Sequence, residues 1–553
     1  MNQRRLVVWI TLGLVYLMVY QAWVEDYGRK PDMSSTAQSF SEAPAASLSS
    51  DTPSLVADHP TLTDAKTADV PNLGSAAPAT NDAITLGVLP SAGRVNVETD
   101  VVQAEIDLVG GDLRRLALTR YPVSKRDPNQ SVLILQDDVA ELLSVAQTGL
   151  LTAQGPNAPT HHDLFDADQT QYRWAVGTER LEVPLRWQSK SNDIAVKKTY
   201  VFYPEQYRID VRFDIDNRSE QDWRGAAYTQ IQFQERPKER SLTDVSTYSF
   251  SGPVFFDGKK YQKLKPKELR KQPIQSATSN GWLAKIQHHF LAAIIPNRDA
   301  VYQLSIKPHE QGRNLLSAVA PLTTIAAGSS GSVTEKLFVG PKVQRQLTEL
   351  HPKLKLSVDY GVLTVLSQPL FWLLEQIHRL VKNWGWAIVI VTLLIKLAFY
   401  RLTQTSYRSM AKIRALQPRM KILQERFKDD RKKLSQSMMK MYQEEKINPA
   451  AGCLPLLVQM PVFLAFYWML IETVELRQAP FIGWITDLSS RDPLFILPIL
   501  MGVAMIVQYK LNPKPTDPMQ AKSLAPFLMC LRCFLLCFRL DWFSIGWSTL
   551  CSA

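Results

Sequence analysis

The chain has 553 residues and a formal net charge of +11, with 46% hydrophobic residues, so it is too long for a single core and at least two domains are expected. The basic excess does not indicate a nucleic-acid-binding protein, because the densest basic run lies between two apolar segments, where membrane topology accounts for it. All five cysteines lie from Cys453 onward, which excludes a disulfide-held domain in the middle of the chain.

The N-terminus, residues 1–24, is predicted to be a transmembrane anchor. The apolar run Leu6–Val24 follows Arg4 and Arg5, and about 19 apolar residues match the thickness of the hydrocarbon core. A cleaved signal peptide is the alternative, but Ala22 is followed by the bulky Trp23 and no small-x-small cleavage site is present. We therefore expect an uncleaved anchor whose N-terminus is cytoplasmic.

Residues 25–83 and 84–350 differ in composition. The first range is rich in Ser, Ala, Thr, Pro and Asp, which predicts a disordered periplasmic linker. The second contains short alternating stretches, such as Val101–Leu108 and Tyr200–Phe213, that are interrupted by turn residues. This pattern predicts an all-β sandwich of many strands.

Residues 361–383 are predicted to form an amphipathic helix in the membrane interface. The apolar residues recur at helical spacing and the charged residues fall on the other side. The apolar set is Leu370, Leu373, Leu374, Ile377 and Val381, and the polar set is Glu375, His378, Arg379 and Lys382. A helix packed on the β-domain is the alternative.

Residues 384–553 are predicted to form the transmembrane core, with apolar spans at Trp384–Tyr400, Leu454–Ile471 and Pro493–Val507. Between the first two spans, residues 403–447 carry many Lys and Arg residues, so this stretch should be a cytoplasmic helical hairpin, with a kink at Pro418. The β-domain is then periplasmic. The hairpin residues that we single out are Met410, Lys412, Arg414, Arg431, Lys432 and Lys433. Its methionines are read as the seam between the two helices rather than as a substrate-binding surface.

The candidate site is a cation inside a span. Lys396 lies within the Trp384–Tyr400 run, Thr392 lies one helical turn before it, and Gln459 lies in the next span. A buried amine is costly in hydrocarbon, so these groups predict a wet groove open to the cytoplasm. Snorkelling of Lys396 to the headgroups is an equal alternative. A solute transporter is a further alternative, although no Asp or Glu lies inside the apolar runs between Trp384 and Ile471.

Several motifs in this region resemble the YidC/Oxa family of membrane protein insertases. They include Asn383-Trp384-Gly385-Trp386, Leu416-Gln417-Pro418, Asn448-Pro449-Ala450-Ala451-Gly452-Cys453-Leu454-Pro455, Gln459-Met460-Pro461 and Asp517-Pro518-Met519-Gln520. The resemblance covers about residues 1–522 and implies the Gram-negative form. That form has an all-α helical bundle in the bacterial inner membrane and a periplasmic all-β supersandwich domain.

The resemblance also implies function. Nascent membrane proteins would place polar tails in the groove of Lys396, Thr392 and Gln459 while their apolar segments slide along Met460, Phe463 and Phe466. The Sec translocon, the lipid bilayer and the ribosome are the implied partners, and no cofactor is expected. Lys396 stands where the family typically has arginine, so the positive charge is kept but the bidentate fork is lost.

Two features depart from this account or compete with it. Residues 523–553 do not resemble the end of the family's chains. A membrane-anchored periplasmic carbohydrate-binding or carbohydrate-modifying protein is the rival function, with His161, His162, His288 and His289 as candidate metal or acid–base groups. Because adjacent histidines in strands point in opposite directions, no metal site and no catalytic site are expected.

Overall fold

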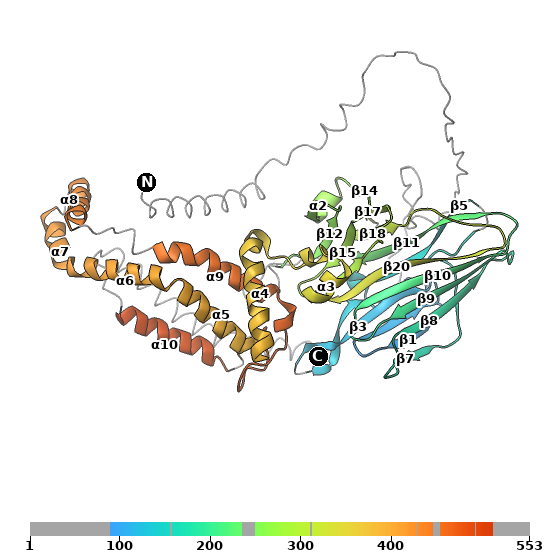
Figure 1. Ribbon diagram of the computed structural model, residues 1–553, viewed down its shortest axis with the longest axis horizontal. Coiled ribbons are helices and arrows are strands. Elements are labelled where there is room, and N and C mark those ends of the chain that lie inside the picture. Colours follow the sequence, from blue (N-terminus) through green and yellow to red (C-terminus); the bar gives the residue numbers. More distant parts are fainter. Residues whose placement is uncertain are drawn as a thin grey trace, which may run out of the picture. The chain divides into compact units, whose positions relative to one another are not determined.

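The computed structural model describes residues 89–511 except 126, 155–156, 235–248, 310–311, 428–429, 446–453, 491 and 493 (Figure 1). The predicted anchor 1–24, the linker 25–83 and the divergent tail 523–553 lie outside the described residues. The chain divides into two compact units. One contains the described residues up to Asp359 together with Ile471–Glu475, and the other contains Tyr360–Leu470 and the described residues from Leu476 onward.

The first unit is an all-β domain of two sheets, as the sequence predicts (Figure 1). In hydrogen-bonded order, the larger sheet contains β14 (Ile274–Thr278), β17 (Tyr302–Pro308), β18 (Arg313–Val319), β11 (Trp223–Gln234), β5 (Ser144–Gln154), β3 (Asp112–Ser124), β2 (Val102–Asp107), β1 (Arg94–Glu98) and β7 (Gln171–Arg173), with β4 (Asp127–Leu135) beside β3 and β19 (Thr323–Ile325) beside β11. The second contains β13 (Tyr261–Lys263), β12 (Gly252–Phe256), β15 (Trp282–Ile286), β16 (Phe290–Ile294), β20 (Ser330–Pro341), β10 (Arg208–Asn217), β9 (Ile194–Phe202), β8 (Leu181–Gln188) and β6 (Asp166–Ala167). β1 and β7 pair in parallel.

Alternation along the strands builds the core. On β10, Ile209, Val211, Phe213 and Ile215 are all buried. A strand places every second side chain on the same face, so these four residues line one face of β10 and fill the interior. Burying each such side chain contributes roughly 1.5–3 kcal/mol.

Two polar bridges cross this core from one sheet to the other. Lys198 on β9 is fully buried, and its Nζ donates hydrogen bonds to the carbonyl oxygens of Gly110 (2.7 Å) and Thr148 on β5 (2.8 Å). Burial lowers the pKa of Lys198 to about 7. In the second bridge, the Tyr302 hydroxyl on β17 donates to Glu335 on β20 at 3.0 Å. Burial raises the pKa of the Glu335 carboxyl to about 8.

All but one of the α-helices described follow the last strand in the chain; the exception, α2, lies between β13 and β14. α2 (Pro266–Leu269) and α3 (Gln344–Leu350) belong to the β-domain unit. The remaining helices are α4 (Thr364–Val381), α5 (Trp384–Ala398), α6 (Tyr400–Ala415), α7 (Gln417–Arg426), α8 (Arg431–Glu444), α9 (Leu454–Glu472) and α10 (Ile496–Leu511). Among the described residues, no single helix has both the length and the apolar character to cross a membrane, although α5 and α6 together, bent by 57°, meet that test.

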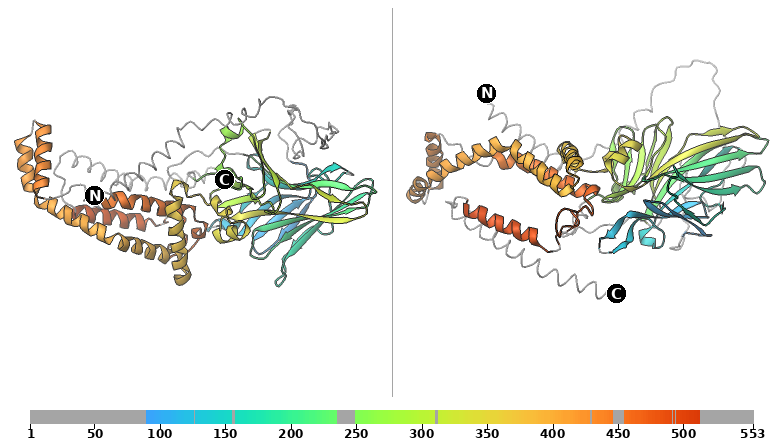
Figure 2. Two further views of the ribbon diagram at one scale, coloured as in Figure 1. Left: turned by 45° about the horizontal axis from the view of Figure 1, so that its top comes forward. Right: turned by 60° about the horizontal axis from the view of Figure 1, so that its bottom comes forward.

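Three sequence predictions can be compared with these helices. Of the predicted apolar set of residues 361–383, α4 buries Leu374 and Ile377, whereas Val381 is exposed, and the interfacial position of this helix stays a prediction. The kink at Pro418 is confirmed, since α6 ends at Ala415 and α7 begins at Gln417. The hairpin has one more helix than expected, because the break at Pro418 divides its first arm into α6 and α7 (Figure 2).

The final residues of α9 belong to the β-domain unit. The backbone oxygen of Ile471 lies 3.1 Å from Nε2 of His288 and 3.0 Å from Nε2 of His289, and Ser249 is hydrogen-bonded to Glu472. Glu472 and Thr473 are both buried. The segment Ile471–Glu475 is thereby held by polar contacts to Ser249 and to the turn that carries His288 and His289.

Candidate functional site

The corner between α4 and α5 sets the start of the helix that carries Lys396. Lys382 ends α4 in the left-handed conformation with φ of 54°, which turns the chain sharply. Asn383 then caps α5, because its Oδ1 accepts a hydrogen bond from the backbone N–H of Trp386 at 3.1 Å. Across the corner, the rings of His378 and Trp384 stack with centroids 3.7 Å apart. The corner is therefore fixed by both backbone and side chains.

The loop between α9 and α10 packs on this end of α5. Asn383 Nδ2 donates to the backbone oxygen of Phe481 at 3.0 Å. The Phe481 ring lies directly on Gly385. A Cβ at position 385 would overlap the ring, because even Cε2, the third-nearest ring atom, would be only 2.8 Å away. Trp386 meets the same ring edge-on, with centroids 5.5 Å apart. Glycine is thus required at position 385 for this close approach.

Further along α5 lie the predicted polar residues. Thr392 and Lys396 are both exposed, whereas Ala387 and Val391 are buried. The Thr392 hydroxyl donates to the backbone oxygen of Ile388 at 2.8 Å, so it is already satisfied within its own helix. Lys396 makes no hydrogen bond or ion pair with any described residue. Its ammonium is available to a ligand, to water or to a headgroup.

The residues predicted on α9 differ in their exposure to solvent. Met460 and Phe463 are 44% and 60% exposed, and Gln459 is half-buried. Phe466, by contrast, is only 8% exposed. The prediction that Phe466 belongs to an exposed apolar face is therefore wrong, because α9 turns this side chain inward, as it does the neighbouring Ala465. The Ser367 hydroxyl on α4 fixes this turn of α9 by donating to the backbone oxygen of Ala465 at 3.0 Å.

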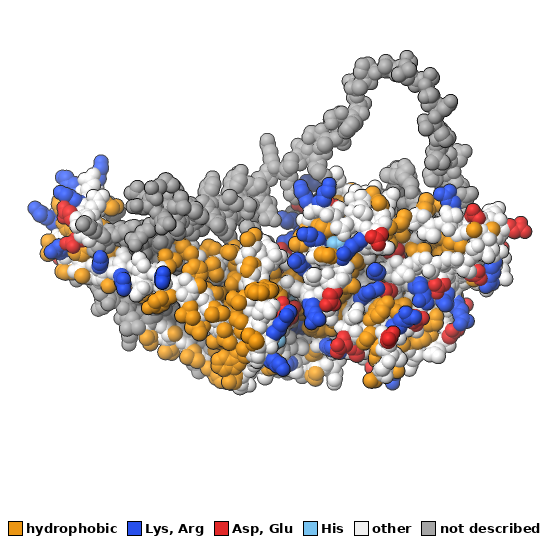
Figure 3. All heavy atoms as spheres, viewed as in Figure 1, with side chains coloured by type: hydrophobic (Ala, Val, Ile, Leu, Met, Phe, Trp, Pro, Cys, Tyr) orange, Lys and Arg blue, Asp and Glu red, His pale blue; other side chains and the backbone are white. Residues whose placement is uncertain are grey.

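The structure brings some of the predicted groove residues together. Thr392 and Lys396 share one face of α5, one helical turn apart. Gln459 lies on a different helix, and no hydrogen bond within the described part of the chain joins it to either residue. The groove of three polar groups therefore stays a prediction. Figure 3 shows hydrophobic side chains gathered over α4, α5 and α10, whereas charges of both signs are interspersed over the β-domain.

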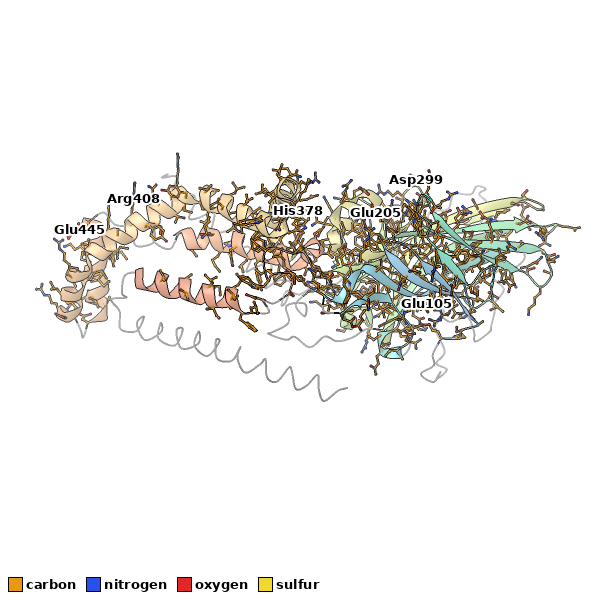
Figure 4. All side chains as sticks on the ribbon, turned by 90° about the horizontal axis from the view of Figure 1, so that it is seen from below. Glu105, Glu205, Asp299, His378, Arg408 and Glu445 are labelled. Carbon is orange, nitrogen blue, oxygen red and sulfur yellow. The ribbon has the colours of Figure 1, made fainter. Side chains whose placement is uncertain are left out.

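The hairpin presents its charges outward. Lys412, Lys432 and Lys433 are exposed. Arg408 on α6 also points away from the ribbon (Figure 4). The backbones of Met410, Arg414 and Arg431 are helical, but their side chains lie outside the described part of the structure.

α7 and α8 pair through their apolar sides. Met420 and Met441 are buried, and the hydroxyl of Tyr442 lies 3.5 Å from Sδ of Met420. Arg419 and Glu445 form an ion pair at 2.7 Å. These contacts support the prediction that the methionines form the seam of the hairpin.

The structure places both histidine pairs of the β-domain. Within the described residues, no group of three or more His, Cys, Asp or Glu side chains is arranged to hold a metal ion. The reason that the sequence suggested was wrong, however, because both pairs lie in turns and not in strands. His288 and His289 stack with centroids 3.8 Å apart and approach the same oxygen, that of Ile471. His161 is buried against Tyr228, with 2.6 Å between Nδ1 and the hydroxyl.

Sequence reasoning assigned no role to Ser367, Asn383, Gly385 or Phe481. The pattern Asn-x-Gly before an apolar run does carry a signal, since Asn is a preferred N-cap. The partner of Asn383 is 98 residues away in the chain, however, and no local pattern predicts that contact. Ser367 lies in a helix whose other buried residues are apolar, which hides its contact with α9.

Comparisons with known proteins show which family the chain resembles. Residues 94–373 match the family model of the YidC periplasmic domain, and residues 376–546 match that of the 60Kd inner membrane protein. The chain is 42% identical over 539 residues to the membrane protein insertase YidC of Nitrosococcus oceani, which covers 97% of this chain and 94% of that protein. It is also 42% identical over 531 residues to the same-named protein of Thioalkalivibrio sulfidiphilus, covering 94% and 91%. Among solved structures, a galactose mutarotase-like protein from Lactobacillus casei matches 45% of this chain and 100% of its own at 13% identity, with a TM-score of 0.32.

Proposed function

Since this chain belongs to the YidC family of membrane protein insertases, an inner-membrane family with a periplasmic domain, we propose that it inserts membrane proteins through a hydrophilic groove formed by α5, α9 and α10. The family's activity is insertion and not catalysis, so no covalent step and no nucleotide is needed. The helices α5, α9 and α10 would belong to the transmembrane core that holds this groove.

The observation that carries the proposal is the exposed ammonium of Lys396 beside Thr392 on one face of an apolar helix. A lysine costs roughly 2.5–3.5 kcal/mol at the centre of a membrane helix on insertion scales and less toward its end. Lys396 lies in the last turn of α5, so its ammonium is stable where water, a headgroup or a polar partner reaches that turn. The polar tail of a nascent chain loses its water when it enters hydrocarbon. A hydrated face inside the inner half of the bilayer shortens the dry distance that the tail must cross.

The apolar segment of the substrate would follow the exposed side of α9. Met460 and Phe463 offer an accessible apolar surface, and Phe466 takes no part in it because it is buried. Moving an apolar side chain from water to such a surface and then into lipid is favourable at about 25 cal/mol for each Å² removed from water. The groove would therefore take up the polar tail of a substrate, and the apolar face of α9 would contact its hydrophobic segment.

Topology and partners follow from the same proposal. The N-terminus and the hairpin α6–α8 would be cytoplasmic, and the loop from about Thr473 to Asp492 would be periplasmic, which agrees with the basic character of the hairpin. The exposed Lys412, Lys432 and Lys433 would face anionic headgroups or the ribosome. Docking of the periplasmic domain to the Sec translocon rests on the family resemblance alone.

The test is an insertion assay with a substrate that has an acidic tail. Lys396→Ala should slow insertion of this substrate several-fold, whereas Lys396→Arg should retain it because the positive charge is kept. A substrate with a neutral tail is the control and should be affected less. Equal insertion of the acidic substrate by the alanine variant and the parent would refute a groove role for Lys396.

A further inference from the structure

One face of α5 carries four residues with very different surroundings. Gly385, Val389, Thr392 and Lys396 are spaced by four, three and four residues, so they lie on the same side of the helix. Gly385 and Lys396 are about 16 Å apart along the axis at 1.5 Å per residue, and about 20° apart around it. Gly385 is buried, Val389 is 46% exposed, and Thr392 and Lys396 are exposed. Within the described part of the chain, this face is therefore covered at its N-terminal end and open from Val389 onward.

The cover at this end is the ring of Phe481. It lies on Gly385 so closely that a Cβ could not be accommodated, and Trp386 supports it from the side. The loop that carries Phe481 is braced by its own hydrogen bonds, including one from the N–H of Phe481 to the oxygen of Ile485 at 3.0 Å. An apolar ring at the N-terminal end of this face interrupts the path of water that would reach Thr392 and Lys396 from that end.

Asn383 fastens this ring to the helix. Its Oδ1 accepts from the N–H of Trp386, and its Nδ2 donates to the oxygen of Phe481. Of the side chains that commonly cap helices, Asp has acceptors only, and Ser and Thr have a single hydroxyl. The planar amide of asparagine presents a donor and an acceptor at fixed positions, so it can make both contacts at once.

We propose that Phe481 seals the groove face of α5 at its periplasmic end and that Asn383 is the positioning residue that holds the seal in place. This inference rests on the proposed function, because it takes the Lys396 face as the groove and the loop as periplasmic. The seal leaves the Lys396 end accessible to water and the Gly385 end dry. An insertase needs such a barrier, because a face that was wet from end to end would conduct ions.

The seal is tested by thiol labelling of the full chain in spheroplasts. The five native cysteines are replaced by serine, Val389→Cys is introduced on the groove face, and a membrane-impermeant maleimide is added from the periplasmic side. Labelling should be low in this background and should rise several-fold when Phe481→Ala is added. Asn383→Asp should also raise it, since aspartate keeps the helix cap but loses the donor to Phe481.

Ile482→Ala is the matched control, because Ile482 is the neighbouring apolar residue of the same loop and is 57% exposed. It should leave labelling at the background level. Equal labelling in Phe481→Ala, Asn383→Asp and Ile482→Ala, with each protein present in the membrane at parental amounts, overturns the seal. The insertion assay on Lys396 is independent of this result. If the labelling contradicts the seal but insertion still depends on the charge of residue 396, the seal is refuted and the proposed function stands.

Discussion

Replacing Glu335 by glutamine should remove a pH dependence from the stability of the β-domain. Glu335 is 1% exposed, and its Oε1 accepts a hydrogen bond from Tyr302 at 3.0 Å, whereas its Oε2 has no hydrogen-bond partner within the described residues. Burial raises the pKa of this carboxyl from 4.5 to about 8, so it is neutral in the folded protein at pH 7. Glutamine keeps the acceptor for Tyr302 and cannot ionise.

The direction and the size of the change in folding stability with pH follow from that shift in pKa. In the folded state the acid binds its proton more tightly than in the unfolded state, so its stabilisation is complete below pH 4.5 and is lost as the pH rises through about 8. At about 1.4 kcal/mol for each unit, the loss by pH 9 is on the order of 5 kcal/mol. Relaxation around the carboxylate reduces this figure, so we expect the glutamine variant to gain a few kcal/mol over the parent at pH 9. For a domain of this size that corresponds to roughly 10 °C in Tm.

The assay is thermal unfolding of the full chain in detergent at pH 5 and pH 9. Near-ultraviolet circular dichroism reports on the β-domain through the fully buried Trp223 and Trp282. The difference in Tm between the variant and the parent should be small at pH 5 and large at pH 9. The exposed Glu179→Gln controls for the loss of a negative charge. A difference that is the same at both pH values would refute the reasoning.

Two further predictions concern a turn and the hairpin. Gly110→Ala should lower the free energy of unfolding by at least about 2 kcal/mol, because φ is +76° and the new Cβ would overlap the carbonyl oxygen of His161. The control is Gly328→Ala, which should cost only about 1 kcal/mol because φ is +69° but the space around the residue is open. Equal losses of the two variants in a denaturant titration would contradict this prediction. Lys432→Gln combined with Lys433→Gln should speed amide hydrogen exchange over α8 several-fold in nanodiscs of anionic lipid and leave it unchanged in neutral lipid. Unchanged exchange in anionic lipid would exclude a headgroup contact.

Sequence patterns predicted the parts of this molecule in which polar and apolar residues alternate. The strands around Phe213 and the buried side of α4 at Leu374 and Ile377 are cases of this kind. The buried side of α9 could not be predicted in the same way, because nearly all its residues are apolar and their spacing therefore does not distinguish a buried face from an exposed one. The exposed Phe463 and the buried Phe466 are the same residue type, and only packing separates them.

The candidate site shows the same division. Lys396 stands out because a cation in an apolar run is costly, whatever the fold around it. The contact between Asn383 and Phe481 joins residues that are 98 positions apart, and no local rule pairs them. The two histidine pairs were misjudged because their turns were taken for strands.

The attachment of α4 to both neighbouring helices has a mechanical consequence. His378 holds the first turn of α5, and Ser367 holds α9 at Ala465, seven residues before that helix ends. The two helices are thus clamped at one pair of ends, whereas their other ends, near Lys396 and Gln459, lead into the hairpin. Under the proposed function, a substrate would therefore separate the two helices at their Lys396 and Gln459 ends, whereas the contacts of His378 and Ser367 hold the opposite ends together.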